Sequence, residues 1–351
     1  MLTKVRYSPI DMLMWTRREI FGFLVFALAV TVANEVFGLR FLHLPWTPIA
    51  AVGTAAAFIV GFQNNAAYGR IWEARKIWGG IVNASRTFGM KARDMVSNEY
   101  AKEAASEDEL AEQRRVLIHR HVAWLTALRH AMRQPKSWEE FEDHATNREW
   151  SAMACIPERR GTLEEDLAKI LPANELEGVL KKRNKQGAIL FLQSAHLREL
   201  KERGLVWEFS FLELENVLEE LFTLQGKSER IKNFPYPRQY ATLSYQFVWI
   251  FVLMLPFAVI PEFEKLGETL VARWPQFAEH FVWMSVPFCA LISWIFHTME
   301  RIGRVGENPF EGSANDVPIS TISRGIEIDL RQLLEEADIP EQFPEQYNVQ
   351  M

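Results

Sequence analysis

Four apolar blocks dominate the hydropathy pattern of the chain. They cover approximately residues 20–39, 46–69, 241–260 and 281–298, and charged side chains are nearly absent from them. A buried helix of a soluble protein would carry a polar face on every turn, and these blocks show no such face. Each block is close to the ~20 apolar residues with which a helix crosses a lipid bilayer. The pattern therefore predicts four transmembrane helices.

Positive charges gather at one end of each apolar block. Arg17 and Arg18 precede the first block, and Arg70, Arg75 and Lys76 follow the second. Further basic residues flank the third and fourth blocks on the same side, namely Lys227, Arg230, Lys232, Arg238, Arg301 and Arg304. By the positive-inside rule, both termini and the long middle of the chain are expected to be cytoplasmic.

A different pattern fills the stretch between the second and third blocks. Apolar residues recur there at three- and four-residue spacing, as in 114–132, 187–204 and 209–225, whereas strand alternation is absent. We therefore expect an all-α membrane protein. Its predicted parts are an N-terminal stretch with membrane helices one and two (1–70), a cytosolic helical region (71–233), membrane helices three and four (234–300), and a cytosolic C-terminal segment with its tail (301–351).

Averages over the 351 residues conceal this organisation. Charged residues make up 24% and hydrophobic ones 48%, as in a soluble protein, because four apolar blocks are averaged with a charged middle. The net charge of −6 argues against nucleic-acid binding, which relies on basic patches. Two cysteines, Cys155 and Cys289, form no cluster of zinc-binding type. Nucleotide-binding, hydrolase and metalloprotease motifs are absent, so we expect no enzyme.

The second apolar block carries a distinctive periodicity. Thr54, Phe58 and Phe62 recur every four residues and so form one stripe on a helix. One interpretation is a packing stripe against the other membrane helices. The other is a pore-lining stripe, in which phenyl rings from several subunits make a hydrophobic constriction. Three amides, Gln63, Asn64 and Asn65, follow at the inner end of the block. Amides are costly in lipid and stable beside water, which favours the pore interpretation.

Several motifs in order resemble the bestrophin family in its bacterial branch. The stretch 61–79 reads GFQNNAAYGRIWEARKIWG, with the spacing Arg70-x-Trp72. Pro235 and Pro237 stand at the entry to the third block, and ENPFEG follows the fourth at 307–312. The resemblance extends over roughly 5–335.

The resemblance implies a homopentameric ion channel around one central pore. Family members have a neck lined by three bulky apolar positions on the second membrane helix, which match Thr54, Phe58 and Phe62. Thr54 departs from the large aliphatic residue expected there, so the outer neck ring is expected to be wider or wetter. Gln63, Asn64 and Asn65 then lie at the inner end of the neck. A lower cytosolic constriction matches Leu212.

The family comparison also bears on metals. Eukaryotic relatives bind calcium after the NPF element through a dense acidic run. Few carboxylates remain here, and Asp316 is the one candidate ligand in the segment. Calcium is coordinated by about six to eight oxygens. We therefore expect no cofactor, and the favoured interpretation of this segment is a turn built around the Asp316 side chain.

The expected function is passive flow of small monovalent ions through a fivefold pore in the cell inner (plasma) membrane. Chloride is the family default, and sodium or potassium is the alternative because the subunit is acidic. Two other classes of protein remain open from the residues alone. One is a membrane-anchored scaffold or sensor with a helical partner-binding module. The other is a transporter, which would usually show repeated halves.

Overall fold

The computed structural model describes residues 1–4, 6–139, 141–154 and 156–351, so Cys155 lies outside the described residues. Within them the fold is built from helices, and pairing of strand type is limited to isolated bridges such as Leu2 with Val349. The longer helices are α2 (Arg17–Glu35), α3 (Trp46–Met95), α4 (Glu107–Arg133), α9 (Lys185–Arg203), α10 (Glu208–Asn233), α11 (Arg238–Leu270), α13 (Ser285–Gly306) and α14 (Ile319–Leu333).

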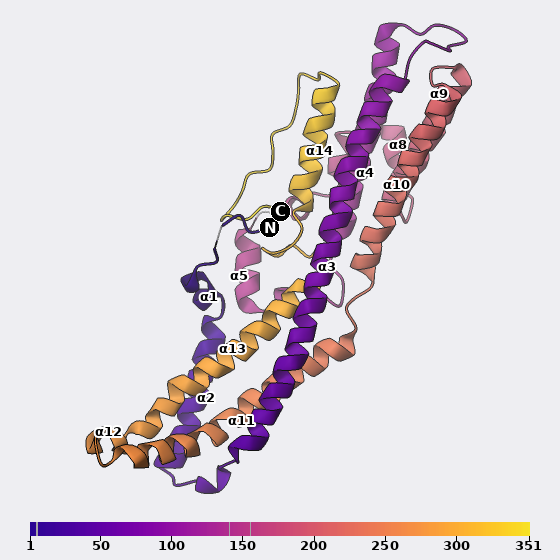
Figure 1. Ribbon diagram of the computed structural model, residues 1–351. Helices are drawn as coiled ribbons and strands as arrows, with labels where there is room; N and C mark the ends of the chain where they lie inside the picture. The colour runs from indigo at the N-terminus through magenta and orange to yellow at the C-terminus, as the bar shows by residue number, and fades with distance from the viewer. Residues whose placement is uncertain (5, 140, 155) are drawn as a thin grey trace.

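Shorter helices join these elements. They are α1 (Pro9–Trp15), η1 (Arg40–Leu42), η2 (Phe141–Asp143), α5 (Ala145–Met153), α6 (Pro157–Arg160), α7 (Leu163–Ala168), α8 (Ala173–Leu180), α12 (Pro275–Glu279) and η3 (Phe281–Met284). The two chain ends lie together beside the middle of the molecule, near α5 and α14 (Figure 1).

Helix α3 is the spine of an elongated molecule (Figure 1). Its 50 residues extend for about 75 Å at ~1.5 Å per residue. One half packs with α11 and α13, which in turn contact α2, and the other half packs with α4, α10 and α14. The sequence predicted a membrane helix ending near residue 69 and a separate region from 71. The helix instead continues through this point, because residues 70–78 include no proline and favour helix.

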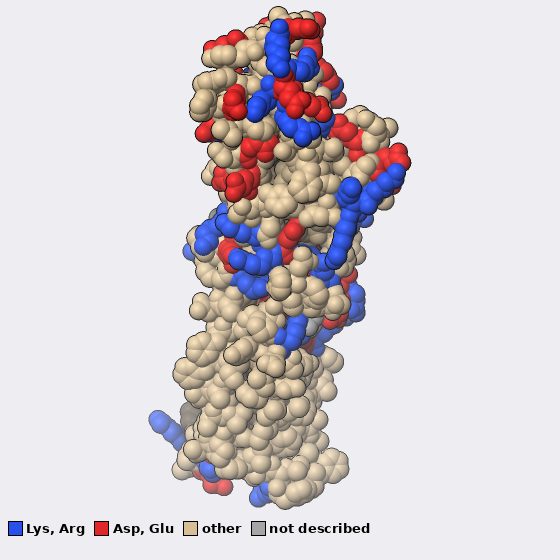
Figure 2. Space-filling model, turned by 90° about the vertical axis from the view of Figure 1, so that its right-hand side faces the viewer, with Lys and Arg blue, Asp and Glu red and all other residues tan. Residues whose placement is uncertain are grey.

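The half that contains α2, α11 and α13 is almost free of charge on its surface. Figure 2 shows a broad uncharged belt, with charged side chains above it and a few at its lower tip. Three helices among the described residues are long and apolar enough to cross a membrane, namely α3, α11 and the segment Phe281–Gly306. Helix α2 is apolar from Ile20 onward and begins with Arg17, Arg18 and Glu19. A further charge, Glu35, ends the helix.

Small residues allow α3 to approach α11 closely inside this belt. A β-carbon placed on Gly53 would lie 2.5 Å from the Phe251 ring, so a larger residue would have to displace that ring or the helix. Phe251 belongs to an apolar cluster with Leu255 of α11 and Cys289 of α13. Close helix contact at small residues is the usual basis of packing in lipid, where no hydrophobic effect drives helices together.

The charged half has its own apolar core. Trp78 and Phe88 of α3 pack there with Trp124 of α4, and all three side chains are fully buried. Ser106 caps the start of α4, because its hydroxyl accepts a hydrogen bond from the Glu109 backbone N–H. This core fixes the position of α3 at the end opposite to the uncharged belt.

Candidate functional site

The predicted stripe of α3 lies on an exposed face of the subunit. Thr54 is exposed, and the side chains of Phe58 and Phe62 are 65% and 71% exposed. Large aromatic side chains exposed in a row on one helix are the kind of surface that marks an interaction site. The Thr54 hydroxyl donates a 2.9 Å hydrogen bond to the Ala50 carbonyl, which satisfies it within the helix.

A groove of 810 Å³ runs along this face. Its lining includes Gly53 and Ala57 of α3 together with Phe251 of α11 and Phe296 of α13. Gly61, which the sequence grouped with Gly53 and Ala57, has open space at its β-position and makes no close helix contact. The exposed face is therefore apolar over several turns.

The three amides that follow the stripe separate in the structure. Gln63 is only 2% exposed, and its side-chain amide donates a 3.0 Å hydrogen bond to the Glu307 carboxylate. Asn64 turns toward Gly303 of α13. Asn65 stays exposed and lines the groove beside Phe62. Gln63 therefore faces the interior of the subunit, where a buried amide needs an internal partner. Its place at the inner end of a pore stays a prediction.

Arg70, near the middle of α3, links this helix to two other segments. Its Nε donates to the Glu307 carbonyl at 2.7 Å, and Nη2 donates to the carbonyls of Ile231 and Phe234 at 2.9 and 3.1 Å. The carbonyls at the ends of α10 and α13 thus find a donor. The sequence marked Arg70-x-Trp72 as distinctive without revealing this role, because Glu307 is far away along the chain.

The segment after α13 forms a closed turn around Asp316. The Asp316 carboxylate accepts hydrogen bonds from the Gly312 N–H (2.6 Å) and from the Ser313 hydroxyl, and it lies 3.6 Å from the Arg133 guanidinium. Gly312 has φ +108°, a conformation that favours glycine. A carboxylate filled by protein donors and an arginine does not fit a calcium ligand. The described residues contain no group of three side chains suited to a metal ion.

Leu212, the predicted lower constriction, lies in the second turn of α10. Its side chain is 51% exposed. The neighbouring Glu213 pairs with Lys91 of α3 at 2.6 Å, which places this turn beside the last turns of α3. Leu212 is thus at the end of the spine opposite to Thr54.

The chain matches a known protein family over nearly its whole length. The model of the bacterial and fungal bestrophin proteins matches residues 11–272 and 275–332. The chain belongs to the bestrophin family. The resemblance seen in the sequence is thereby confirmed for nearly the whole chain.

Curated relatives of this family are similar over most of their length. The voltage-dependent anion channel-forming protein YneE of Escherichia coli (strain K12) is 27% identical over 320 residues, which is 88% of this chain and 86% of the relative. The voltage-dependent anion channel-forming protein RSc3414 of Ralstonia nicotianae is 27% identical over 319 residues, 90% of this chain and 87% of the relative.

Solved structures share the fold. A bacterial bestrophin homologue from Klebsiella pneumoniae, solved by Zn-SAD phasing, superposes with a TM-score of 0.68 at 24% identity. The match covers 91% of this chain and 98% of that one. A mutated form of a Klebsiella pneumoniae homologue also gives 0.68, at 23% identity, over 90% of this chain and 98% of that one. The helical order described above is therefore the bestrophin fold.

Proposed function

We propose that this bestrophin is an ion channel that conducts small monovalent anions, chloride among them, through a pore shared by five copies of the chain. The exposed stripe on α3 carries the proposal. In a ring of subunits the Thr54, Phe58 and Phe62 side chains of each copy face the axis and form a hydrophobic neck, and Asn65 lies at its inner end. Leu212 forms the lower, cytosolic constriction.

The exposure of the Phe58 and Phe62 side chains supports this assignment. A row of exposed aromatic side chains within an uncharged belt marks a surface that meets another molecule or lines a binding path. Closed cyclic symmetry gives each copy the same surroundings. A narrow ring of phenyl groups controls wetting, so it conducts only when water fills it.

The membrane topology follows from charge. We assign four crossings to α2, α3, α11 and α13, with both termini and the charged half of the molecule in the cytoplasm. Arg17, Arg18 and Arg70 then stand at the cytoplasmic boundary, as the positive-inside rule requires. In this assignment the cytosolic parts are residues 71–233 and 301–351. The membrane helices lie in residues 1–70 and 234–300. We place the protein in the cell inner (plasma) membrane.

Anion selectivity rests on the relatives, which are named as anion channel-forming proteins. Phenyl ring edges carry partial positive charge and can border an anion path. The acidic side chains exposed on α10, such as Glu219 and Glu220, favour cations instead. If these acidic side chains determine selectivity, the channel conducts sodium or potassium instead of anions.

Two measurements on purified protein test the proposal. Native mass in detergent should correspond to five chains, and a monodisperse monomer would exclude a shared pore. In a planar bilayer under a salt gradient, the sign of the reversal potential distinguishes anion from cation flow. Current absent at every voltage, with pentamers present, would indicate a membrane scaffold in place of a channel.

A further inference from the structure

A separate cavity lies in the charged half of the molecule and includes no residue of α3. Its volume is 540 Å³, within the range of about 300–1,000 Å³ typical of small-molecule sites. Residues of α4, α6, α7 and α14 form its walls, and the C-terminal segment from Phe343 onward closes one side.

Basic side chains outnumber acidic ones in its wall. The charged lining residues are Arg129, Arg160, Glu165, Asp166, Lys169 and Arg324. Glu165 is engaged in the capping box of α7, where its carboxylate accepts from the Thr162 N–H at 2.9 Å. Asp166 accepts from His130 (2.9 Å) and Lys169 (3.1 Å). The hydrogen bond from His130 holds the pKa of the Asp166 carboxyl well below its usual range.

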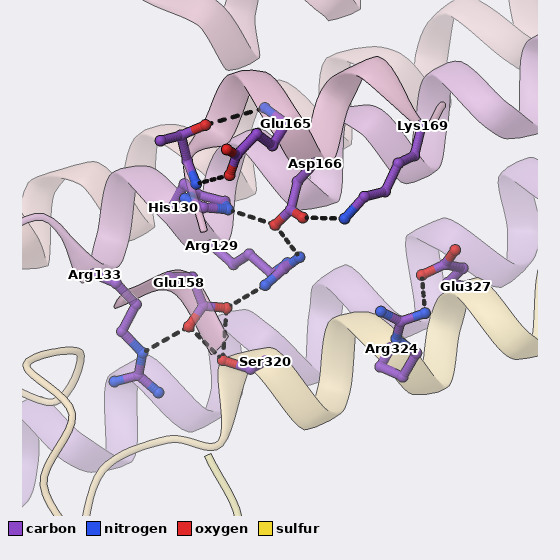
Figure 3. Close-up of polar contacts among 11 residues, drawn as sticks. Arg129, His130, Arg133, Glu158, Glu165, Asp166, Lys169, Ser320, Arg324 and Glu327 are labelled. Carbon is purple, nitrogen blue, oxygen red and sulfur yellow. Dashed lines mark hydrogen bonds and ion pairs between the residues drawn. The ribbon is translucent and has the colours of Figure 1, made fainter. Parts of the chain in front are cut away.

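The positive charge of Arg129 is already balanced by two carboxylates. Figure 3 shows its guanidinium between the carboxylates of Asp166 and Glu158, and the Ser320 hydroxyl of α14 also donates to Glu158. Burial raises the pKa of Glu158, but the charges of Arg129 and Arg133 outweigh it and leave that pKa below its usual range. This buried network satisfies its own charges and holds α4, α6, α7 and α14 together.

The guanidinium groups of Arg324 and Arg160 can still bind an anion. Arg324 pairs with Glu327 at 3.2 Å, but its buried Nε–H has no hydrogen-bond partner among the described residues. Leaving such a buried donor unpaired is unfavourable, and a ligand oxygen would satisfy it. Arg160 is exposed at the rim, and no ion pair of its guanidinium occurs within the described ranges. The Phe343 ring lies 4.5 Å from the Arg324 guanidinium and adds an apolar surface.

We propose that this cavity binds a small phosphorylated organic molecule. Its phosphate would lie between Arg324 and Arg160, and its organic part would lie against Phe343. Arg160 at the rim and the unpaired Nε–H of Arg324 are the donors that the phosphate oxygens would accept from. Planar guanidinium groups match phosphate oxygens in pairs, which makes arginine the usual residue at such sites.

Phenyl phosphate is the probe, because it combines a phosphate with a ring of the size of the Phe343 surface. Isothermal titration of the full-length protein in detergent should show saturable binding of phenyl phosphate. Inorganic phosphate should bind more weakly and phenol should not bind. Equal binding of phenol would mean that the cavity selects the ring and not the anion, and absence of phenyl phosphate binding at millimolar concentration would overturn the proposal.

Variants locate the site. Arg160→Glu reverses a rim charge without touching the buried network and should weaken phenyl phosphate binding about tenfold or more. Arg183→Glu is the matched control, since Arg183 is also exposed but does not line the cavity. Phe343→Ala should weaken phenyl phosphate but not inorganic phosphate. Equal losses in Arg160→Glu and Arg183→Glu would refute the assignment. The titration needs no ion flow, so it stands independently of the channel proposal.

Discussion

The buried side-chain amide of Gln63 donates a 3.0 Å hydrogen bond to the carboxylate of Glu307, 244 residues later in the chain. This contact joins the helix that carries Phe58 and Phe62 to the turn that follows α13. Arg70 reinforces the junction from the next turns of α3 through the Glu307 carbonyl. The proposed neck is therefore held by polar contacts on the side of α3 that faces the subunit interior.

Gln63→Leu should destabilise the protein by about 1–3 kcal/mol, because the buried Glu307 carboxylate loses a donor. Gln63→Glu should be worse, since it buries a second carboxylate beside the first. Thermal unfolding in detergent measures both. Asn65→Leu, at an exposed position two residues on, is the control and should leave the midpoint unchanged. A Gln63→Leu midpoint equal to that of the wild type would show that the contact contributes nothing.

The double substitution Phe58→Ala and Phe62→Ala should raise anion flux severalfold in proteoliposomes, because a wider and less apolar neck wets more readily. Phe21→Ala is the matched control. Phe21 is 69% exposed on α2, away from the groove, so its loss should leave flux unchanged. Unchanged flux in the double variant, with normal assembly, would mean that the α3 stripe serves packing alone.

Lys76 should influence ion selectivity. It lies 18 residues after Phe58, about five helical turns, and thus on the same exposed face of the continuous helix α3. Five copies would place a positive ring below the neck. Lys76→Glu should shift the reversal potential toward cation permeation, most clearly at low salt. Lys182→Glu changes the same charge at an exposed position after α8 and should leave the potential unchanged. An equal shift in both variants would assign the effect to net charge.

The sequence predicted the face shared by residues along one helix, but it did not predict contacts between segments that are distant in the chain. The four-residue spacing of Thr54, Phe58 and Phe62 predicted a shared face, and all three side chains are exposed in the subunit. The orientation of Gln63 depends on Glu307, so no local pattern reveals it. A change in composition near residue 70 was interpreted as an element boundary. Helical backbone hydrogen bonds form in lipid and in water alike, and α3 continues across this point.

Gly53→Ala should destabilise the uncharged half by about 1–3 kcal/mol, because the new methyl group would lie 2.5 Å from the Phe251 ring and force α3 and α11 apart. Gly22→Ala is the control, since nothing lies within 4 Å of its β-position on α2. Thermal unfolding in detergent compares the two. A Gly53→Ala midpoint at or above the wild-type value would show that the helices separate without cost.

His121 should make the charged half sensitive to acid. Its ring stacks on Phe88 at 5.1 Å, and neither ring nitrogen has a hydrogen-bond partner among the described residues. Burial lowers the pKa of His121 from 6.5 to about 3. Above pH 6.5 neither state binds the proton, and the full stability is present. As the pH falls from 6.5 toward 3, only the unfolded chain is protonated, so stability declines by up to about 1.4 kcal/mol per pH unit.

The variant His121→Phe isolates this contribution, because it keeps an aromatic ring against Phe88 and removes the titrating group. Burial also lowers the pKa values of His144 and His196 to about 4, so both variant and wild type retain some loss of stability in acid. The unfolding midpoints of the two proteins should therefore diverge as the pH falls below 6.5, with the wild type falling faster. Parallel curves over this range would mean that His121 accepts its proton in the folded protein.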